Sequence, residues 1–106
     1  MAYSRIGEVG GEYSLTMACG NLPCDAVVAA AGHEANGYFW EGIATLLAPD
    51  LVEHLEMDSD PDGFKATGLR SDLEELRNKL EPVVSSTALL QELLRRAQRE
   101  GFEFDD

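Results

Sequence analysis

The sequence predicts an α+β domain, a small antiparallel sheet of about three strands with about four helices packed on it. Residues 12–19 alternate between apolar and polar side chains, which is the pattern of a half-buried strand, and four later segments have the apolar spacing, caps or proline placement of helices. At 106 residues, the chain is long enough to bury a core without a metal or disulfides. We therefore expect one domain over residues 1–106, in which residues 1–11 are a flexible or edge segment.

Two helices are predicted after the first strand. A short helix with small side chains is expected from Asp25, with Pro23 at its entry and Gly32 at its end. A second helix is expected over residues 38–47, where apolar side chains recur at helical spacing. Pro49 stops this helix because it has no backbone N–H to donate.

A hairpin and a third helix are expected next. Two short strands, over residues 52–57 and 64–68, are joined by a turn rich in Asp, Pro and Gly. Ser71 and Glu74 then have the spacing of a capping box, in which each side chain satisfies a free backbone amide at a helix start. We expect this helix to end near Pro82.

The last helix is expected over residues 87–100. Its leucines share one face, and Glu92 and Arg96 are spaced as an i, i+4 ion pair on the opposite face. Phe102 and Phe104 follow as a small apolar hook.

Acidic residues dominate the chain. Twenty Asp and Glu stand against eight Lys and Arg, a formal net charge of −12. Between Ile6 and Phe64 there are eleven acids and no Lys or Arg, so the first 64 residues carry −10 and the last 42 carry −2. This argues against direct binding to nucleic acid or to an anionic membrane, since both need clusters of bases. Such an acidic surface either keeps the protein soluble or steers a basic partner toward it.

The sequence predicts a cytoplasmic protein. Residues 1–11 are polar and Gly-rich, without the apolar run of a signal peptide, and no stretch approaches the roughly 20 apolar residues of a membrane span. Cys19 and Cys24 are too few for a disulfide scaffold and fit a reducing compartment as small buried hydrophobes.

Signals for metal binding or catalysis are weak. Asp58, Asp60 and Asp62 match the first half of a calcium-binding loop, but the twelfth position, which needs a bidentate Glu, holds Leu69. The acids are therefore better explained as part of a hairpin turn.

The cysteines and histidines give no better signal. Cys19, Cys24, His33 and His54 have no common zinc spacing, and a Cys and His pair alone does not make a nucleophile and base. We expect no enzymatic activity and no cofactor.

Three consecutive aromatic residues stand at the start of the second helix. The side chains of Tyr38, Phe39 and Trp40 fan over roughly 200°, which is wider than one apolar stripe. The spacing of Trp40 with Ala44 favours a core Trp, leaving Tyr38 and Glu41 as the outward-facing members.

Two blocks of the sequence, Gly-Tyr-x-Trp-Glu at residues 37–41 and the Asp-turn-Gly-Phe segment at residues 58–64, resemble the immunity protein 51 family of bacterial polymorphic toxin systems. The resemblance covers about residues 15–101. One departure lies in the turn, where the family pattern has Asp, Pro and Glu and this chain has Asp-Ser-Asp-Pro-Asp at residues 58–62. If this turn touches the toxin, the departure alters which toxin is bound.

The resemblance implies a non-enzymatic cytoplasmic inhibitor that binds a cognate toxin domain, often a nuclease or another enzyme acting on nucleic acid. An acidic surface fits this role, since it competes for a basic cleft. The residues expected to contact the toxin are Tyr38, Trp40, Glu41, Asp50, Glu53, Glu56, Asp58, Asp60 and Asp62. The alternatives are a small calcium-binding, zinc-binding or catalytic domain that uses the 58–62 turn or the Cys and His residues, and a homo-oligomer that associates through the last helix.

Overall fold

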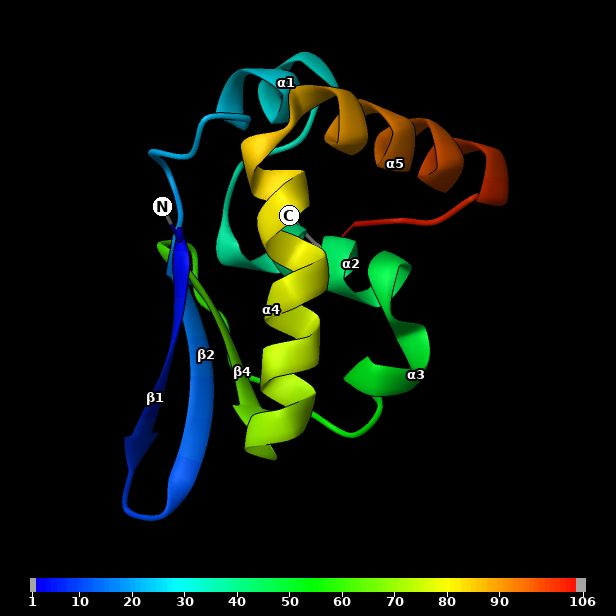
Figure 1. Cartoon of the computed structure of the whole chain (residues 1–106). Helices are drawn as coiled ribbons and strands as arrows, with labels where there is room; N and C mark the ends of the chain where they lie inside the picture. The colour runs from blue at the N-terminus through cyan, green and yellow to red at the C-terminus, as the bar shows by residue number, and fades with distance from the viewer. Residues whose placement is uncertain (1, 105–106) are drawn as a thin grey trace.

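The structure, a computed structural model, describes residues 2–104. Within them, four strands form one antiparallel sheet in the order β1-β2-β4-β3, and the helices lie on one side of this sheet (Figure 1). The predicted α+β fold is confirmed, with one strand and one helix more than expected. The elements are β1 (Ser4–Val9), β2 (Glu12–Ala18), α1 (Asp25–Ala30), α2 (Gly37–Leu47), α3 (Pro49–Val52), β3 (Glu56–Met57), β4 (Gly63–Gly68), α4 (Arg70–Ser85) and α5 (Thr87–Glu100).

Strand β1 is an edge strand in the segment that was expected to be flexible or at an edge, although no strand was predicted there. It pairs with β2 through a two-residue turn, whose Gly10 and Gly11 have φ angles of 61° and 86°. Positive φ at both positions is what the tight hairpin turn requires, and glycine adopts it without strain. The strand has no clear alternation because Gly7 interrupts it and Val9 is 85% exposed.

A carboxylate from α4 fixes the start of β1. The Glu81 side chain accepts hydrogen bonds from the backbone N–H groups of Tyr3 (3.0 Å) and Ser4 (2.7 Å) and from the Ser4 hydroxyl. Burial raises the pKa of Glu81, but these hydrogen bonds and the charge of Arg77 outweigh it and hold that pKa below its usual value. Glu81 therefore satisfies the backbone N–H groups at the start of β1, although β1 is an edge strand of the sheet.

The helix-facing side of the sheet forms the floor of the core. Leu15 and Met17 of β2 alternate with exposed or partly exposed neighbours, as predicted, and Phe64 and Ala66 of β4 lie beside them in register. The other face of the sheet is polar.

Only the end of the strand predicted over residues 52–57 is present in the structure. Residues 52–57 were expected to be extended, but Val52 ends α3 and only Glu56 and Met57 pair with β4. Pro49 explains the difference, because it both terminates α2 and occupies the first turn of α3, where its missing N–H costs nothing.

Helix α4 differs from its prediction at both ends. Its N-cap is Leu69, which makes no side-chain cap, so the expected capping box of Ser71 and Glu74 is wrong. Pro82 lies inside the helix instead of ending it. Burial of the next two residues, Val83 and Val84, stabilises the continued helix against the lost hydrogen bond.

Helix α5 begins and ends where the sequence predicted. The Ser86 hydroxyl accepts from the Leu89 N–H at 3.3 Å. The expected Glu92–Arg96 pair is wrong, since Arg96 pairs with Glu100 at 3.1 Å and donates to the Leu46 carbonyl at 3.0 Å.

The segment after α5 returns to α2. The ring of Phe104 stacks on Phe39 with a centroid separation of 4.9 Å, and a Cβ added at Gly42 would lie 2.4 Å from the Phe104 ring. The Phe104 ring can therefore pack against α2 because Gly42 has no side chain. Among the described helices, none has the length and apolar character needed to cross a membrane.

Candidate functional site

The first turn of α2 is hydrogen-bonded to the turn between β3 and β4. The Asn36 side chain caps α2 by accepting from the Phe39 N–H at 2.9 Å. The Gly37 N–H donates to the Asp60 carbonyl at 3.2 Å. One turn further along α2, a Glu41 carboxylate oxygen accepts from the Ser59 N–H at 3.1 Å. The two sequence blocks that resemble the immunity family thus lie in direct contact.

Glycine is required at the centre of this contact. A Cβ built on Gly37 would lie 2.1 Å from the Gly63 carbonyl oxygen and 2.3 Å from that of Asp60. Both are backbone atoms within a tight turn and have little room to move. Gly37 therefore sets how closely α2 approaches the hairpin.

The β3–β4 turn has its own hydrogen bonds. Asp60 N–H donates to the Gly63 carbonyl at 3.0 Å, and Asp60 Oδ1 accepts from the Asp62 N–H at 2.8 Å. The Ser59 hydroxyl accepts from the Lys65 N–H at 3.0 Å, while the Asp58 N–H donates to the Lys65 carbonyl at 2.9 Å. These bonds give the exposed carboxylates a defined spacing.

Five of the residues expected to bind a partner belong to the two segments that make this contact. Tyr38 is 36% exposed, Glu41 is half-buried, and the three aspartates of the turn are exposed. We call this surface the acidic corner; it consists of Tyr38, Glu41, Asp58, Asp60 and Asp62.

Trp40 does not belong to the acidic corner. Its side chain is fully buried and meets the edge of the Phe39 ring, with centroids 5.5 Å apart at 87°. Its expected contact with a partner is corrected accordingly, because a residue without exposed surface cannot touch a partner while the fold is intact. The indole Nε1 has no hydrogen-bond partner among the described residues.

The other three expected residues are exposed but lie elsewhere. Asp50 and Glu53 belong to α3 and the residue after it, beyond the far end of α2, whose eleven residues span about 16 Å. Glu56 stands on the polar face of the sheet opposite Thr67. Asp50 and Glu53 extend the negative surface away from the acidic corner, while Glu56 lines a hollow beside Asp58 of that corner.

Asp58, Asp60 and Asp62 form no ion pair with a base in the part of the chain that the structure describes. The Arg70–Glu74 and Arg96–Glu100 pairs belong to α4 and α5, and Arg5 and Lys65 line a hollow beside Asp58 and Asp60 without pairing with them. The charges of these three aspartates are therefore open to a partner.

The residues considered for metal binding or catalysis are placed unfavourably for those roles. Among the described residues, no three His, Cys, Asp or Glu side chains are grouped to hold a metal ion. Burial raises the pKa of Cys19 and of Cys24 to about 11, so both thiols are protonated at neutral pH. His33 packs against Phe39 and Phe104, with centroid distances of 5.5 and 4.8 Å.

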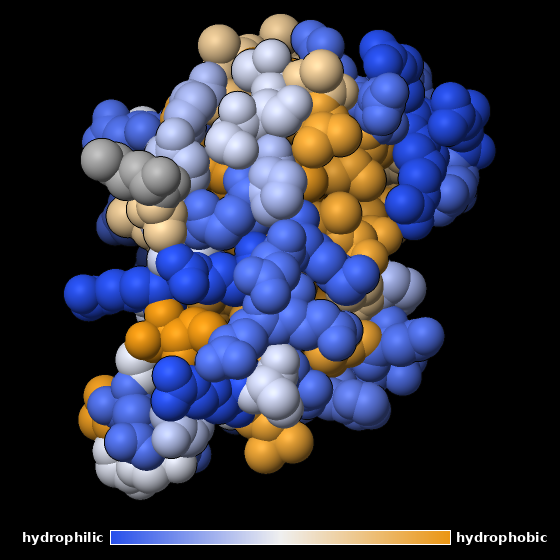
Figure 2. Space-filling view, viewed as in Figure 1, coloured by the Kyte–Doolittle hydropathy of each residue, from blue (hydrophilic) through white to orange (hydrophobic). Residues whose placement is uncertain are grey.

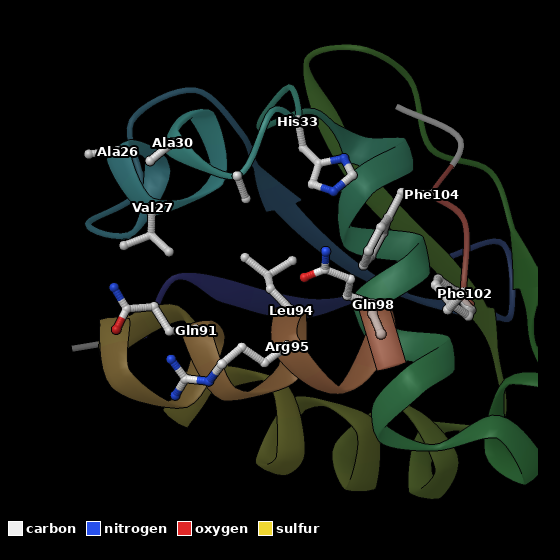
Figure 3. Close-up of a pocket in the computed structure, with 12 residues that line it drawn as sticks. Ala26, Val27, Ala30, His33, Gln91, Leu94, Arg95, Gln98, Phe102 and Phe104 are labelled. Carbon is white, nitrogen blue, oxygen red and sulfur yellow. The ribbon is translucent and has the colours of Figure 1, made fainter. Parts of the chain in front are cut away.

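A cavity of about 700 Å³ opens between α1 and α5. In Figure 3, Val27 of α1 points across the cavity toward Leu94 of α5, and His33 and Phe104 lie at one end of it. Among residues 2–104, no carboxylate or thiol lines this cavity. Its walls can bury an apolar group, but they supply no nucleophile and no paired acid and base.

Sequence analysis missed two features that the fold creates. The first is the contact of Glu81 with β1, for which the sequence gives no signal. The second is a groove between α4 and α5 with several bases at its rim. Its signal was present in the sequence as four bases between residues 79 and 99.

Comparisons with protein families, with curated proteins and with solved structures found no match to this chain. The resemblance to the immunity family therefore stays a prediction, and the arguments about function depend on the residues themselves.

Proposed function

We propose that this protein is a cytoplasmic immunity protein that binds a cognate toxin domain and inhibits it without catalysing a reaction. The observation that carries the proposal is the acidic corner, where exposed carboxylates and an exposed Tyr ring are held together by backbone contacts. The two blocks that resemble the family meet at this corner.

The charge favours a basic partner. Eleven acids and a single base in the first 64 residues produce a negative potential that attracts a positively charged surface over about one Debye length, some 8–10 Å at physiological salt. A toxin domain that acts on nucleic acid needs a basic cleft for its substrate. Carboxylates placed in that cleft occupy the positions of phosphates and exclude the substrate.

The rigidity of the acidic corner favours tight binding. Binding a flexible loop costs free energy, because side chains and backbone must be ordered on association. Here the turn is already held to α2 by the Gly37 N–H and the Glu41 carboxylate. The free-energy cost of ordering this turn on binding is therefore smaller than for a flexible loop.

Tyr38 supplies the apolar part of the proposed contact. Interface centres are enriched in Tyr, Trp and Arg, which combine a large apolar area with a polar group. Trp40 is inaccessible, so Tyr38 is the aromatic residue that this helix offers to a partner.

The test begins by identifying the partner, from what co-purifies with a tagged copy or from the protein encoded immediately upstream. Association of the isolated partner is then measured with the triple variant Asp58→Asn, Asp60→Asn, Asp62→Asn at low and at physiological salt. Asn keeps the oxygen that accepts from the Asp62 N–H, so the turn retains its shape. We expect the association rate at low salt to fall about ten-fold or more and its salt dependence to decrease.

A control with the same change of net charge is Glu8→Gln, Glu12→Gln, Glu75→Gln, at three exposed acids outside the acidic corner. This variant is expected to associate nearly as fast as the unmodified protein. Equal slowing of both variants would assign the effect to total charge and reject the acidic corner. A partner whose cell-killing activity is unaffected by this protein would reject the immunity function.

A further inference from the structure

A second groove lies between α4 and α5, away from the acidic corner. Its cavity volume is about 560 Å³. Its apolar lining consists of Leu47, Pro82, Val83, Leu89 and Leu93, and its basic lining consists of Lys79, Arg95, Arg96 and Arg99. We call it the α4–α5 groove. Figure 2 shows apolar surface between these two helices, bordered by hydrophilic side chains.

Positive charge is concentrated around this groove. Four of the eight bases of a chain with net charge −12 line it, and Glu92 is the one acid among its lining residues. Arg96 is held in place by Glu100 and by the Leu46 carbonyl. Within residues 2–104, Lys79, Arg95 and Arg99 form no ion pair, so their charges are available to a bound molecule.

Apolar side chains remain uncovered at the same place. Leu90 and Ala97 on the inner side of α5 are buried, but Leu89 is 41% exposed and Leu93 is only partly buried. The apolar face of α5 is therefore wider than the chain's own core can cover. Burial of such surface contributes about 25 cal/mol for each Å², which favours a partner that brings apolar groups of its own.

We propose that the α4–α5 groove binds an acidic amphipathic helix of another protein. Two neighbouring helices offer a groove in which a third helix can lay its apolar stripe on the leucines, while acids along its flanks reach the rim bases. A basic partner would be repelled here. The binding specificity of this groove is thus opposite in charge to that of the acidic corner, and the inference does not depend on the proposed toxin.

A second copy of the chain does not have the features of this partner. Helices α2 and α4 of a second copy have buried most of their apolar residues in their own core. The leucines that stay partly exposed on its α5 stand beside Arg95 and Arg99, which the bases of the groove would repel. Its exposed acids at residues 58–62 lie on a hairpin turn that has no apolar stripe. The acidic helix must therefore come from a different chain.

The test uses a synthetic helical peptide of about 18 residues with Leu at i, i+3, i+4 and i+7 positions and Glu on the flanks. Fluorescence anisotropy measures its binding to the whole protein, and ¹H–¹⁵N NMR spectra locate it. We expect chemical-shift changes confined to α4, α5 and the end of α2. We also expect the double variant Arg95→Glu, Arg99→Glu to raise the dissociation constant at least about ten-fold.

The matched control is Arg5→Glu, Arg70→Glu, which changes net charge equally at exposed sites outside the groove and should leave the dissociation constant within about two-fold. Leu89→Ser tests the apolar contribution and should weaken binding at physiological salt as well. The proposal is overturned if both double variants weaken binding equally, or if a peptide with Lys in place of Glu binds as tightly. Anionic phosphatidylglycerol vesicles that bind the groove where the peptide does not would likewise overturn it.

Discussion

The backbone N–H of Gly37 donates to the carbonyl oxygen of Asp60 over 3.2 Å, so helix α2 starts directly against the β3–β4 turn. The approach is close enough that no side chain fits at residue 37. The shape of the acidic corner consequently depends on a glycine that presents no side chain to a partner.

Gly37→Ala is expected to destabilise the fold by about 1–3 kcal/mol or more, because its Cβ would overlap two backbone carbonyl oxygens. Urea unfolding measures the change in the free energy of unfolding. Gly7→Ala is the control, since a Cβ at this strand position meets nothing within 4 Å. Equal stability of Gly37→Ala and the unmodified protein would show that the two backbone segments are not in this contact.

Trp40→Ala is expected to lower the free energy of unfolding by about 3–5 kcal/mol, because it leaves a large cavity in the core. Trp40→Phe should cost clearly less, since it keeps an aromatic ring and removes an indole N–H that has no partner among the described residues. Thermal and urea unfolding of both variants provide the measurement. A Trp40→Ala variant that stays as stable as the unmodified protein would contradict the core position.

Glu81→Gln is expected to destabilise the protein by about 1 kcal/mol at pH 7, through weaker hydrogen bonds to Tyr3 and Ser4 in a partly exposed site. The folded-state pKa of Glu81 is lowered, so its contribution to stability is present above the unfolded-state value of about 4.3. It is lost as pH falls through the folded-state pKa. The difference between the two proteins should therefore shrink in unfolding experiments below about pH 4. A Glu75→Gln control on the exposed face of α4 should show little difference at any pH.

Cys19 and Cys24 are expected to react slowly with iodoacetamide. With a pKa of about 11, roughly one thiol in a thousand is ionised at pH 8, and the thiolate is the reacting form. Unfolding in urea should accelerate labelling by about 100-fold or more, as each pKa returns to about 8.5. Since unfolding then releases protons, stability should also decrease as pH rises from about 8.5 toward 11. Labelling of the folded protein at the rate of free cysteine would contradict the burial of Cys24 and the partial burial of Cys19.

The sequence predicted those elements whose local signals agree with their packing. Strand β2 has strict alternation, and α5 has both an apolar face and the cap at Ser86. The first part of the strand predicted over residues 52–57 was mispredicted, because a short apolar run fits a strand or a helix equally well, and Pro49 begins a short helix that continues through Val52. The capping box at Ser71 failed because the helix begins at Arg70, one residue before the expected cap.

The candidate site was predictable in composition but not in arrangement. Exposure of the acids follows from their charge, and the core position of Trp40 was favoured by its spacing with Ala44. The contact between Gly37 and Asp60 was not predictable, because it joins backbone atoms of two segments that meet only in the tertiary structure. The α4–α5 groove likewise depends on how two helices pack.

The contact between Glu81 and β1 also affects when, during synthesis of the chain, the domain can fold. Its carboxylate bonds to backbone groups 77 and 78 residues earlier in the chain, and β2 pairs with β4 only across the three helices and the short strand that separate them in the sequence. On the ribosome, the β1–β2 hairpin emerges long before either partner exists, and a lone hairpin is at best marginally stable in water. The complete sheet must therefore wait until β4 and α4 have been synthesised, so folding of this domain occurs late in the synthesis of the chain.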